Sequence, residues 1–207
     1  MRLLRRPPEI IHTHLRPYLA LNGLVYGLFV LGMGVTVLFP DLQTMGLDPF
    51  QGEVGGNASI VDAVKHSVWL FGLTILTINV VPTALVQIAL PSLIVPFLGT
   101  AVFAFRAFSF GVTLAPTNEV YANILLPHSL TLLIEFQAYI LVMLGSYILG
   151  KSWIRPPPPM TRAQGYRHGL TQLGWLTLGA APLFIVGAFY EAYEIIHLIP
   201  RVIANTS

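Results

Sequence analysis

Apolar residues dominate five long windows of this chain, and polar residues fall mainly between them. The windows cover about residues 18–39, 66–89, 92–114, 128–150 and 170–199. A window of about 20 apolar residues is long enough to cross the hydrocarbon core of a bilayer as a helix. None of the windows shows the ten-residue alternation that is typical of a membrane β-barrel. The pattern therefore predicts an all-α bundle of five transmembrane helices.

Composition supports a membrane-embedded chain. Hydrophobic residues make up 55% of the 207 residues and charged residues only 10%, whereas soluble proteins carry about 25% charge. The mean hydropathy is +0.72. The sequence contains no cysteine, which excludes disulfides, thiolate metal sites and thiol nucleophiles. The isoelectric point near 9.0 comes from few residues, so we predict no nucleic-acid partner and interpret the positive charge as a topology signal.

Basic residues are concentrated in two stretches that share one side of the five-span arrangement. Residues 1–17 and residues 151–169 each contain four Lys or Arg, whereas the opposite side carries Lys65 and Arg201. The positive-inside rule therefore places the N-terminus in the cytoplasm and the C-terminus outside. The first apolar window is not followed by a small-residue cleavage site, so we interpret it as an uncleaved span.

These boundaries predict three parts of the chain. Residues 1–17 form a basic cytoplasmic or interfacial segment, residues 18–199 form the five-span domain, and residues 200–207 form a short outer tail. No stretch is long enough for a separate soluble domain. The predicted location is therefore a plasma membrane that the chain crosses several times.

Charged residues inside the apolar windows are the candidate functional positions, because a charged side chain in hydrocarbon is costly and usually has a partner. At a rise of about 1.5 Å per residue, Glu135 lies roughly 10 Å below the outer end of its span, and Glu191 and Arg106 lie roughly 12 Å below theirs. We therefore expect one polar layer in the outer half, with an ion pair from Arg106 to Glu135 or Glu191. The predicted polar cluster comprises Asn79, Arg106, His128, Glu135, Glu191, Glu194 and His197.

The polar cluster is open to several interpretations. It can hold the helices together, form a proton or ion pathway, or line a groove for a peptide, a lipid or a partner helix. A metal site is a further alternative, because Glu194 and His197 have the Glu-x-x-His spacing of carboxylate-bridged di-iron bundles. Those bundles need two such motifs and two further carboxylates within the bundle, and the apolar windows contain one motif. We therefore predict neither a metal nor a cofactor.

Enzyme signatures are weak in this sequence. It contains neither the Gly-x-Ser-x-Gly motif of serine hydrolases nor the His-Glu-x-x-His motif of zinc proteases. We therefore predict that the protein is not an enzyme, and an intramembrane enzyme stays a distant alternative. Such an enzyme would need to form product as pure protein and lose this activity when one carboxylate or histidine is changed.

A pair of small residues lies in the first window. Gly23 and Gly27 have the four-residue spacing that lets two helix backbones approach closely. We expect this pair to pack against another helix of the same chain, because the chain has several spans. Contact with a second copy, which would give a homo-oligomer, is the alternative.

Several polar residues lie at characteristic positions in the apolar windows. Pro127 and His128 stand at the start of the fourth window, and Glu135 follows seven residues after His128. Asn79 lies inside the second window, and Glu191 lies in an apolar and aromatic context in the last. This combination resembles the stage II sporulation protein M family of bacterial multispanning membrane proteins, which has Pro-His-Gly and a later Glu at its fourth span. The resemblance covers most of the chain and agrees with its span count.

The resemblance implies a non-enzymatic scaffold in a bacterial plasma membrane. Besides membrane lipid, the partners that it implies are other membrane or envelope proteins, such as a peptidoglycan hydrolase or an ABC-type transporter. The chain departs from the family at Ser129, where the family usually has Gly, and at residues 109–111, where Asn-Gly and a later Gly are common. The alternative function is a transport component for a peptide, a lipid or an ion, with the polar cluster as its pathway.

Overall fold

The computed structural model describes residues 6–44 and 66–204, and every regular element within them is a helix. The predicted all-α class is therefore confirmed. Two segments, η2 and η3, have π-helical hydrogen bonding and continue α-helices without a break. The elements are α1 (Arg6–Thr13), α2 (Leu15–Leu38), α3 (Asp41–Thr44), α6 (Val68–Ile78), η2 (Asn79–Ala89), α7 (Leu90–Ile94), α8 (Leu98–Thr113), α9 (Glu119–Ile154), α10 (Arg162–Tyr193), η3 (Glu194–Leu198) and α11 (Ile199–Ala204).

Four continuous helices of the described chain are long and apolar enough to cross a membrane. They are Leu15–Leu38, Val68–Ile94, Glu119–Ile154 and Arg162–Val202. Helix α8 is apolar but has only 16 residues, which corresponds to a length of roughly 24 Å. The five-span count and the orientation of the two termini stay predictions. Within the predicted outer tail, α11 continues the last long helix to Ala204.

The third predicted window, residues 92–114, begins too early. The second long helix continues through Pro91 to Ile94, and the chain turns only at residues 95–97. Phe97 adopts a left-handed backbone conformation with φ 68°. The turn is tight because Gly99 has no side chain, and a Cβ atom there would lie 1.8 Å from the Ile88 carbonyl oxygen. Pro91, directly before the predicted start of the third window, is therefore accommodated inside the second long helix.

Helices α9 and α10 both begin before their predicted windows, which start at residues 128 and 170. Asn118 caps α9 by accepting a hydrogen bond from the Tyr121 backbone N–H at 3.0 Å. Thr161 and Gln164 form a capping box at the start of α10. Polar caps stabilise the first turn of a helix. Hydropathy therefore located the apolar surface of these helices, whereas the capping residues set where they begin.

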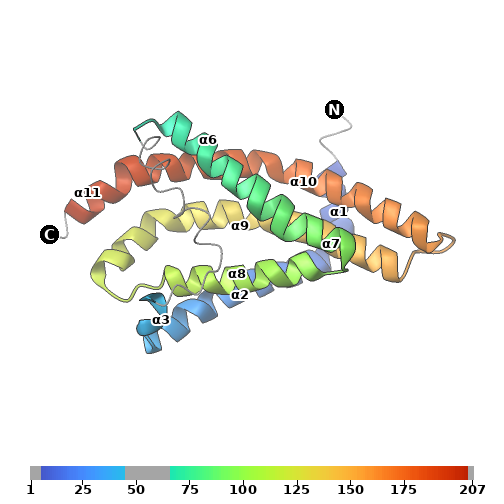
Figure 1. The fold of residues 1–207 in the computed structure, drawn as a ribbon, viewed down its shortest axis with the longest axis horizontal. Coiled ribbons are helices and arrows are strands. Elements are labelled where there is room, and N and C mark those ends of the chain that lie inside the picture. The colour runs from blue at the N-terminus through green and yellow to red at the C-terminus, as the bar shows by residue number, and fades with distance from the viewer. Residues whose placement is uncertain (1–5, 45–65, 205–207) are drawn as a thin grey trace.

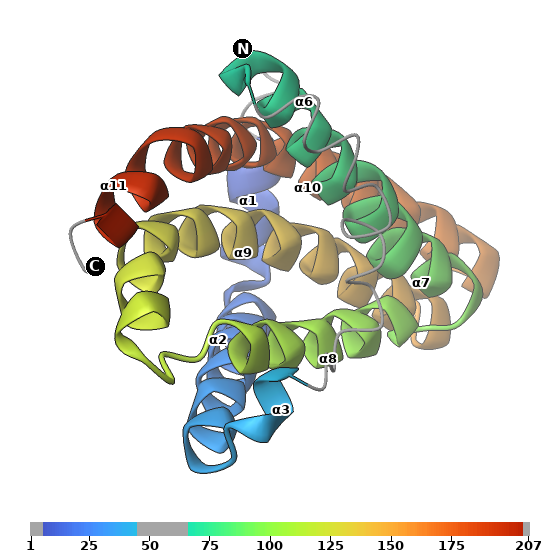
Figure 2. The ribbon, with the colours of Figure 1, turned by 60° about the vertical axis from the view of Figure 1, so that its left-hand side comes forward.

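Helix α9 is the central element of the bundle. Of its most apolar window, 78% is buried, compared with 22% for α2. Figures 1 and 2 show α9 between α10 and α6 on one side and α8 and α2 on the other. Aromatic rings fill the space around it, with Tyr139 packed against Phe103 and Phe184, and Phe136 packed against Phe29. The buried side chains of α9 therefore meet several other helices.

The predicted contact at Gly23 and Gly27 is not made within the described chain. Both residues are exposed, and a Cβ atom at either would meet no described atom within 4 Å. Helix α2 instead approaches α8 closely at Gly32 and Gly111, where a Cβ atom would lie about 2 Å from a carbonyl oxygen of the other helix. The expected packing contact is therefore not seen among the described residues, and both packing within the chain and contact with a second copy stay predictions.

Candidate functional site

A cavity of about 260 Å³ lies between the α6–η2 helix, α8, α9 and the α10–η3 helix. Its wall is mainly apolar and includes Phe71, Ile75, Ile78, Phe110, Leu132, Phe136 and Ile195. Five residues of the predicted polar cluster also line the cavity: Asn79, Arg106, His128, Glu135 and Glu191. The fold therefore brings together polar side chains that are far apart in the sequence.

Glu135 is the central acceptor in this cavity. The Asn79 side-chain amide donates a hydrogen bond to it at 2.5 Å, and the Tyr139 hydroxyl donates to the other end of the same amide at 2.8 Å. Glu191 of α10 lines the same cavity as Glu135. Gly187 makes room for this arrangement, because a Cβ atom there would lie 2.8 Å from the Glu135 side chain. Glu135 therefore joins α9 to η2 and to α10.

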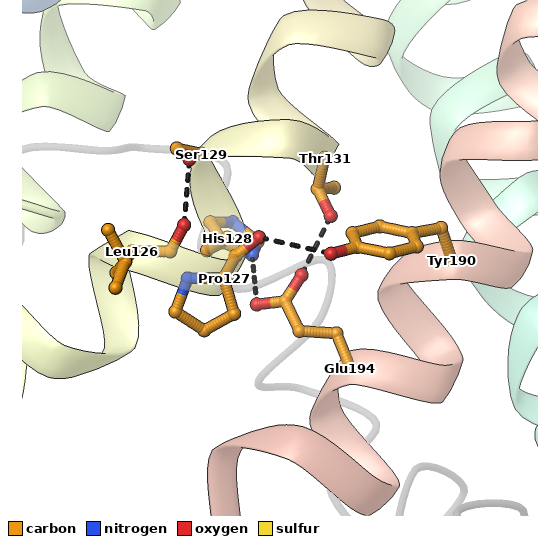
Figure 3. Close-up of polar contacts among 7 residues, drawn as sticks. All are labelled: Leu126, Pro127, His128, Ser129, Thr131, Tyr190 and Glu194. Carbon is orange, nitrogen blue, oxygen red and sulfur yellow. Dashed lines mark hydrogen bonds and ion pairs between the residues drawn. The ribbon is translucent and has the colours of Figure 1, made fainter. Parts of the chain in front are cut away.

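A second carboxyl group, that of Glu194, is fully buried next to the cavity (Figure 3). One of its oxygens lies 3.0 Å from His128 Nδ1, and the other accepts a hydrogen bond from the Thr131 hydroxyl at 2.8 Å. The Tyr190 hydroxyl donates to the Pro127 carbonyl oxygen at 3.5 Å. These contacts hold the end of the last long helix against the first part of α9.

Arg106 lies deep in the bundle, with 6% of its surface exposed. Its guanidinium donates a hydrogen bond to the side-chain oxygen of Gln87 at 3.1 Å and lies 5.1 Å from the centre of the Phe110 ring. Arg106 lines the same cavity as Glu135 and Glu191. The structure thus assigns Arg106 an amide partner that the sequence did not suggest, and the ion pair with one of the two carboxylates stays a prediction.

His197 lies apart from the other members of the predicted polar cluster. Its ring is 5.1 Å from the Tyr193 ring on the same helix, and it does not line the cavity. Its Glu-x-x-His partner, Glu194, faces His128 instead. In the described part of the chain, no group of three or more His, Asp or Glu side chains is arranged to hold a metal ion.

Both π-helical segments border this polar region, and π-helical turns are frequent at functional sites. In η2, Pro82 lies inside the helix and has no backbone N–H to donate, and the neighbouring Thr83 hydroxyl donates a hydrogen bond to the Ile78 carbonyl oxygen at 3.2 Å. Threonine hydroxyls that donate to backbone carbonyls, together with local π-helical adjustments, let a membrane helix tolerate a proline. Pro82 is therefore accommodated within the continuous helix Val68–Ile94.

Sequence reasoning missed three residues that complete the polar contacts. Gln87 was a polar residue inside an apolar window and could have been flagged by the same logic as Asn79. Tyr139 and Thr131 gave no comparable signal, because tyrosine and threonine are common in ordinary helices. Their roles depend on which face of α9 points toward the cavity, and hydropathy does not determine this.

A separate polar network, also missed, joins α2 to α9. The Tyr18 hydroxyl donates to the Gln137 side-chain oxygen at 2.6 Å, and the Gln137 amide donates to Asn22 at 2.7 Å and to the Tyr26 hydroxyl at 3.0 Å. Its members satisfy one another across two helices. We therefore interpret this network as interhelical hydrogen bonding that holds α2 against α9.

Residues 145–152 match the Gly-x-x-x-x-Gly-Lys-Ser pattern of nucleotide-binding loops. That motif binds phosphate only as a loop between a strand and a helix, where its backbone N–H groups are open. Here the whole stretch lies inside α9, and its backbone is helical. The match therefore does not form a phosphate-binding loop.

The site can do two things chemically. Carboxyl, imidazole and hydroxyl groups in contact can exchange protons, and a mainly apolar cavity with a few polar groups can bind a small ligand. No protein-family model, curated protein or solved structure matches this chain. The resemblance to the stage II sporulation protein M family therefore stays a prediction that rests on the residues themselves.

Proposed function

We propose that the protein is a non-catalytic integral membrane scaffold or accessory subunit that assembles with envelope or transport proteins in a bacterial plasma membrane. The observation that supports this proposal is the pairing of carboxyl groups across helices. Glu135 pairs with Asn79 of η2, and Glu194 pairs with His128 and Thr131 of α9. Side chains whose polar groups satisfy one another stabilise an assembly of helices.

A scaffold must present a fixed surface to its partners, and the cross-helix pairing explains how this chain does so. In hydrocarbon, an unsatisfied polar group costs several kcal/mol, so each pair favours one mutual position of the helices. The exposed face of α2 at Gly23 and Gly27 leaves room for the close approach of another helix. These features agree with a subunit whose own fold is fixed and whose outer face is available to a partner.

The cavity favours a second function, a transport component for a peptide, a lipid or an ion. A polar contact that only holds helices together needs no empty space beside it. Glu135 and Glu191, in contrast, border a cavity of about 260 Å³. In this alternative the paired carboxyl groups couple their protonation to the movement of a substrate. Intramembrane carboxylates and histidines build such relays in known pumps and transporters.

The first experiment is purification from the native host in mild detergent, followed by mass spectrometry of the bound proteins. A stoichiometric ATPase, permease or envelope hydrolase would support the scaffold and name the process. Recovery of the protein alone, with a lipid or peptide retained in the cavity, would overturn the obligate scaffold. The cavity would then be the place to look for transport.

The second experiment separates the two functions by a charge-neutral change. In a scaffold, Glu135→Gln should change only the stability of the protein or its binding to a partner. In a transporter, the same variant abolishes flux while the protein stays folded and assembled. Glu119→Gln is the matched control, because Glu119 lies at the exposed start of the same helix. Equal effects of the two variants would contradict a special role for the cavity.

A further inference from the structure

One face of α10 begins with basic residues and continues as an apolar groove. A pocket of about 550 Å³ at the start of α10 is lined by Leu93, Trp153, Arg162, Ala163, Tyr166 and Arg167. A second pocket of about 510 Å³ lies between η2, α7 and α10, and its α10 side is lined by Leu170, Leu173, Gly174, Thr177, Leu178, Ala181 and Phe184. Leu93 lines both pockets, so the basic pocket adjoins the apolar groove.

The two pockets use a single stripe of α10. The α10 residues that line the two pockets recur every three or four positions, which is the spacing of one helix face. They are residues 163, 166, 167, 170, 173, 174, 177, 178, 181 and 184. From Leu170 to Phe184 the groove extends roughly 21 Å at the α-helical rise. One leaflet of hydrocarbon is about 15 Å thick. The groove is therefore long enough for one acyl chain that starts at the basic end.

The basic pocket has the composition of a membrane interface. Arg162 and Arg167 are exposed, and the Trp153 and Tyr166 rings pack edge to face, with 5.1 Å between their centres. The Tyr166 hydroxyl donates to the Leu93 carbonyl oxygen at 3.1 Å, which fixes this aromatic wall against α7. Trp and Tyr concentrate at headgroup depth, and arginine binds phosphate in a bidentate manner.

The groove itself has space that no side chain of the described chain fills. A Cβ atom at Gly174 would meet no described atom within 4 Å. The groove-lining residues are almost all aliphatic, with Phe184 at the far end and Thr177 as the only hydroxyl. An acyl chain matches this lining, whereas a polar peptide would leave its backbone groups unsatisfied.

We propose that this continuous site binds one anionic phospholipid, with its phosphate on Arg162 and Arg167 and one acyl chain along the groove. Basic pockets between membrane helices bind acidic lipid headgroups in this way. The site is separate from the polar cavity and does not depend on the proposed function. It predicts that the fold carries a structural lipid at the end where α10 begins.

Native mass spectrometry of the full chain tests the headgroup contact. The protein is released from vesicles of equal phosphatidylglycerol and phosphatidylcholine, and retained lipids are counted. We expect one phosphatidylglycerol per chain, and about tenfold or greater loss of it in the Arg162→Gln/Arg167→Gln variant. The matched control, Lys151→Gln/Arg155→Gln, removes the same charge from the same hairpin outside the pocket. It should retain the lipid within about twofold of wild type.

Equal loss in the two double variants would overturn the proposal, because it would show general electrostatic attraction. Equal retention of phosphatidylcholine and phosphatidylglycerol would also overturn it. A second copy of the chain seated in the groove, detected as a dimer that excludes lipid, would do the same.

The variant Gly174→Leu tests the acyl contact independently of charge. A Cβ atom there meets open space, so a leucine side chain should extend into the groove and leave folding unchanged by circular dichroism and melting. We expect a loss of retained phosphatidylglycerol of about tenfold. We also expect that excess glycerol phosphate fails to compete with the lipid for wild type. Retention by Gly174→Leu, or full competition by glycerol phosphate, would show a phosphate site without an acyl groove and would contradict the proposal.

Discussion

Two consecutive parts of α9 are held in the bundle by different physics. The apolar part, residues 140–150, lies against α10 at Gly145 and Gly169, where helix backbones approach so closely that a Cβ atom would lie within 3 Å of the other helix. The polar part, residues 128–139, is held by hydrogen bonds around a cavity. The first part gains from close packing, and the second gains from directional bonds. The comparison separates the close packing that stabilises the bundle from the hydrogen bonds that fix the positions of the polar side chains around the cavity.

The difference has a physical cause in the membrane. Lipid tails are as apolar as leucine, so membrane helices associate through close packing and interhelical hydrogen bonds rather than through the hydrophobic effect. Close packing needs small residues and no empty space. A polar site needs bonded partners and tolerates a cavity. The same helix can therefore provide a rigid base and, one or two turns further along, a site that can bind or exchange a proton.

The largest effect is expected from Gly169→Ala in the apolar part. A Cβ atom there would lie 2.5 Å from the Leu149 Cα, so α9 and α10 would have to separate. We expect the free energy of unfolding to fall by about 3 kcal/mol, the upper end for overpacked cores. Gly174→Ala on the same helix is the matched control, since its Cβ meets open space, and it should gain about 0.5–1 kcal/mol. Thermal unfolding in detergent measures both, and equal melting temperatures would contradict close packing.

A smaller effect is expected from Asn79→Leu in the polar part. The change removes the amide that donates to Glu135 and accepts from Tyr139. Leaving these buried groups without a partner should cost about 1–3 kcal/mol of unfolding free energy. The control is Thr74→Val, which lines the same cavity but hydrogen-bonds within its own helix and should cost less than about 0.5 kcal/mol. Equal costs would show that the cavity wall, and not the bond to Glu135, decides stability.

The contact between His128 and Glu194 is expected to contribute less still. A double-mutant cycle with His128→Leu and Glu194→Gln should give a coupling free energy of about 0.6–1.7 kcal/mol, the range found for hydrogen bonds between membrane helices. A second cycle that pairs His128→Leu with Glu119→Gln should give none, because these residues lie about 13 Å apart along α9. Unfolding free energies of the four proteins in each cycle provide the measurement. A coupling below 0.3 kcal/mol in the first cycle would contradict the pair as a link between helices.

The sequence predicted the polar part better than the apolar part. Counting depth from the span ends placed Glu135, Glu191 and Arg106 in one layer, and all three line one cavity. A buried charge is rare in hydrocarbon and therefore informative. The hydrogen-bond partner Tyr139 was not predictable, because hydropathy does not determine which face of α9 points toward the cavity.

The apolar part and the helix ends were less predictable for different reasons. Hydropathy does not distinguish a glycine at a helix contact from one on the surface. The spacing of Gly23 and Gly27 predicted a close helix contact, whereas Gly32 and Gly111 make the close contact between α2 and α8. The all-α class followed directly from composition. The turn at residues 95–97 did not, because the apolar pattern predicted a third window that begins at residue 92, whereas the second long helix continues to Ile94.

Helix α2 allows the same comparison between two glycines of one helix, and its variant Gly27→Leu has the smallest expected effect on the fold. A Cβ atom at Gly32 would lie 2.2 Å from the Phe108 carbonyl oxygen, whereas Gly27 faces open space in the described chain. Gly27→Leu should therefore leave the free energy of unfolding of the monomer within about 1 kcal/mol of wild type. Gly32→Ala should lower it by about 1–3 kcal/mol.

Self-association adds the second readout for α2. If Gly23 and Gly27 meet a second copy, Gly27→Leu abolishes dimers that form in nanodiscs, as cross-linking and mass photometry detect, while the monomer stays folded. If dimers persist in Gly27→Leu, the face is not a homodimer contact, and the exposed glycines are available only to a different partner. A loss of monomer stability in Gly27→Leu equal to that in Gly32→Ala would contradict the division of α2 into an inner and an outer face. Glycine spacing would then report backbone contact at both positions, and the orientation of α2 would have to be revised.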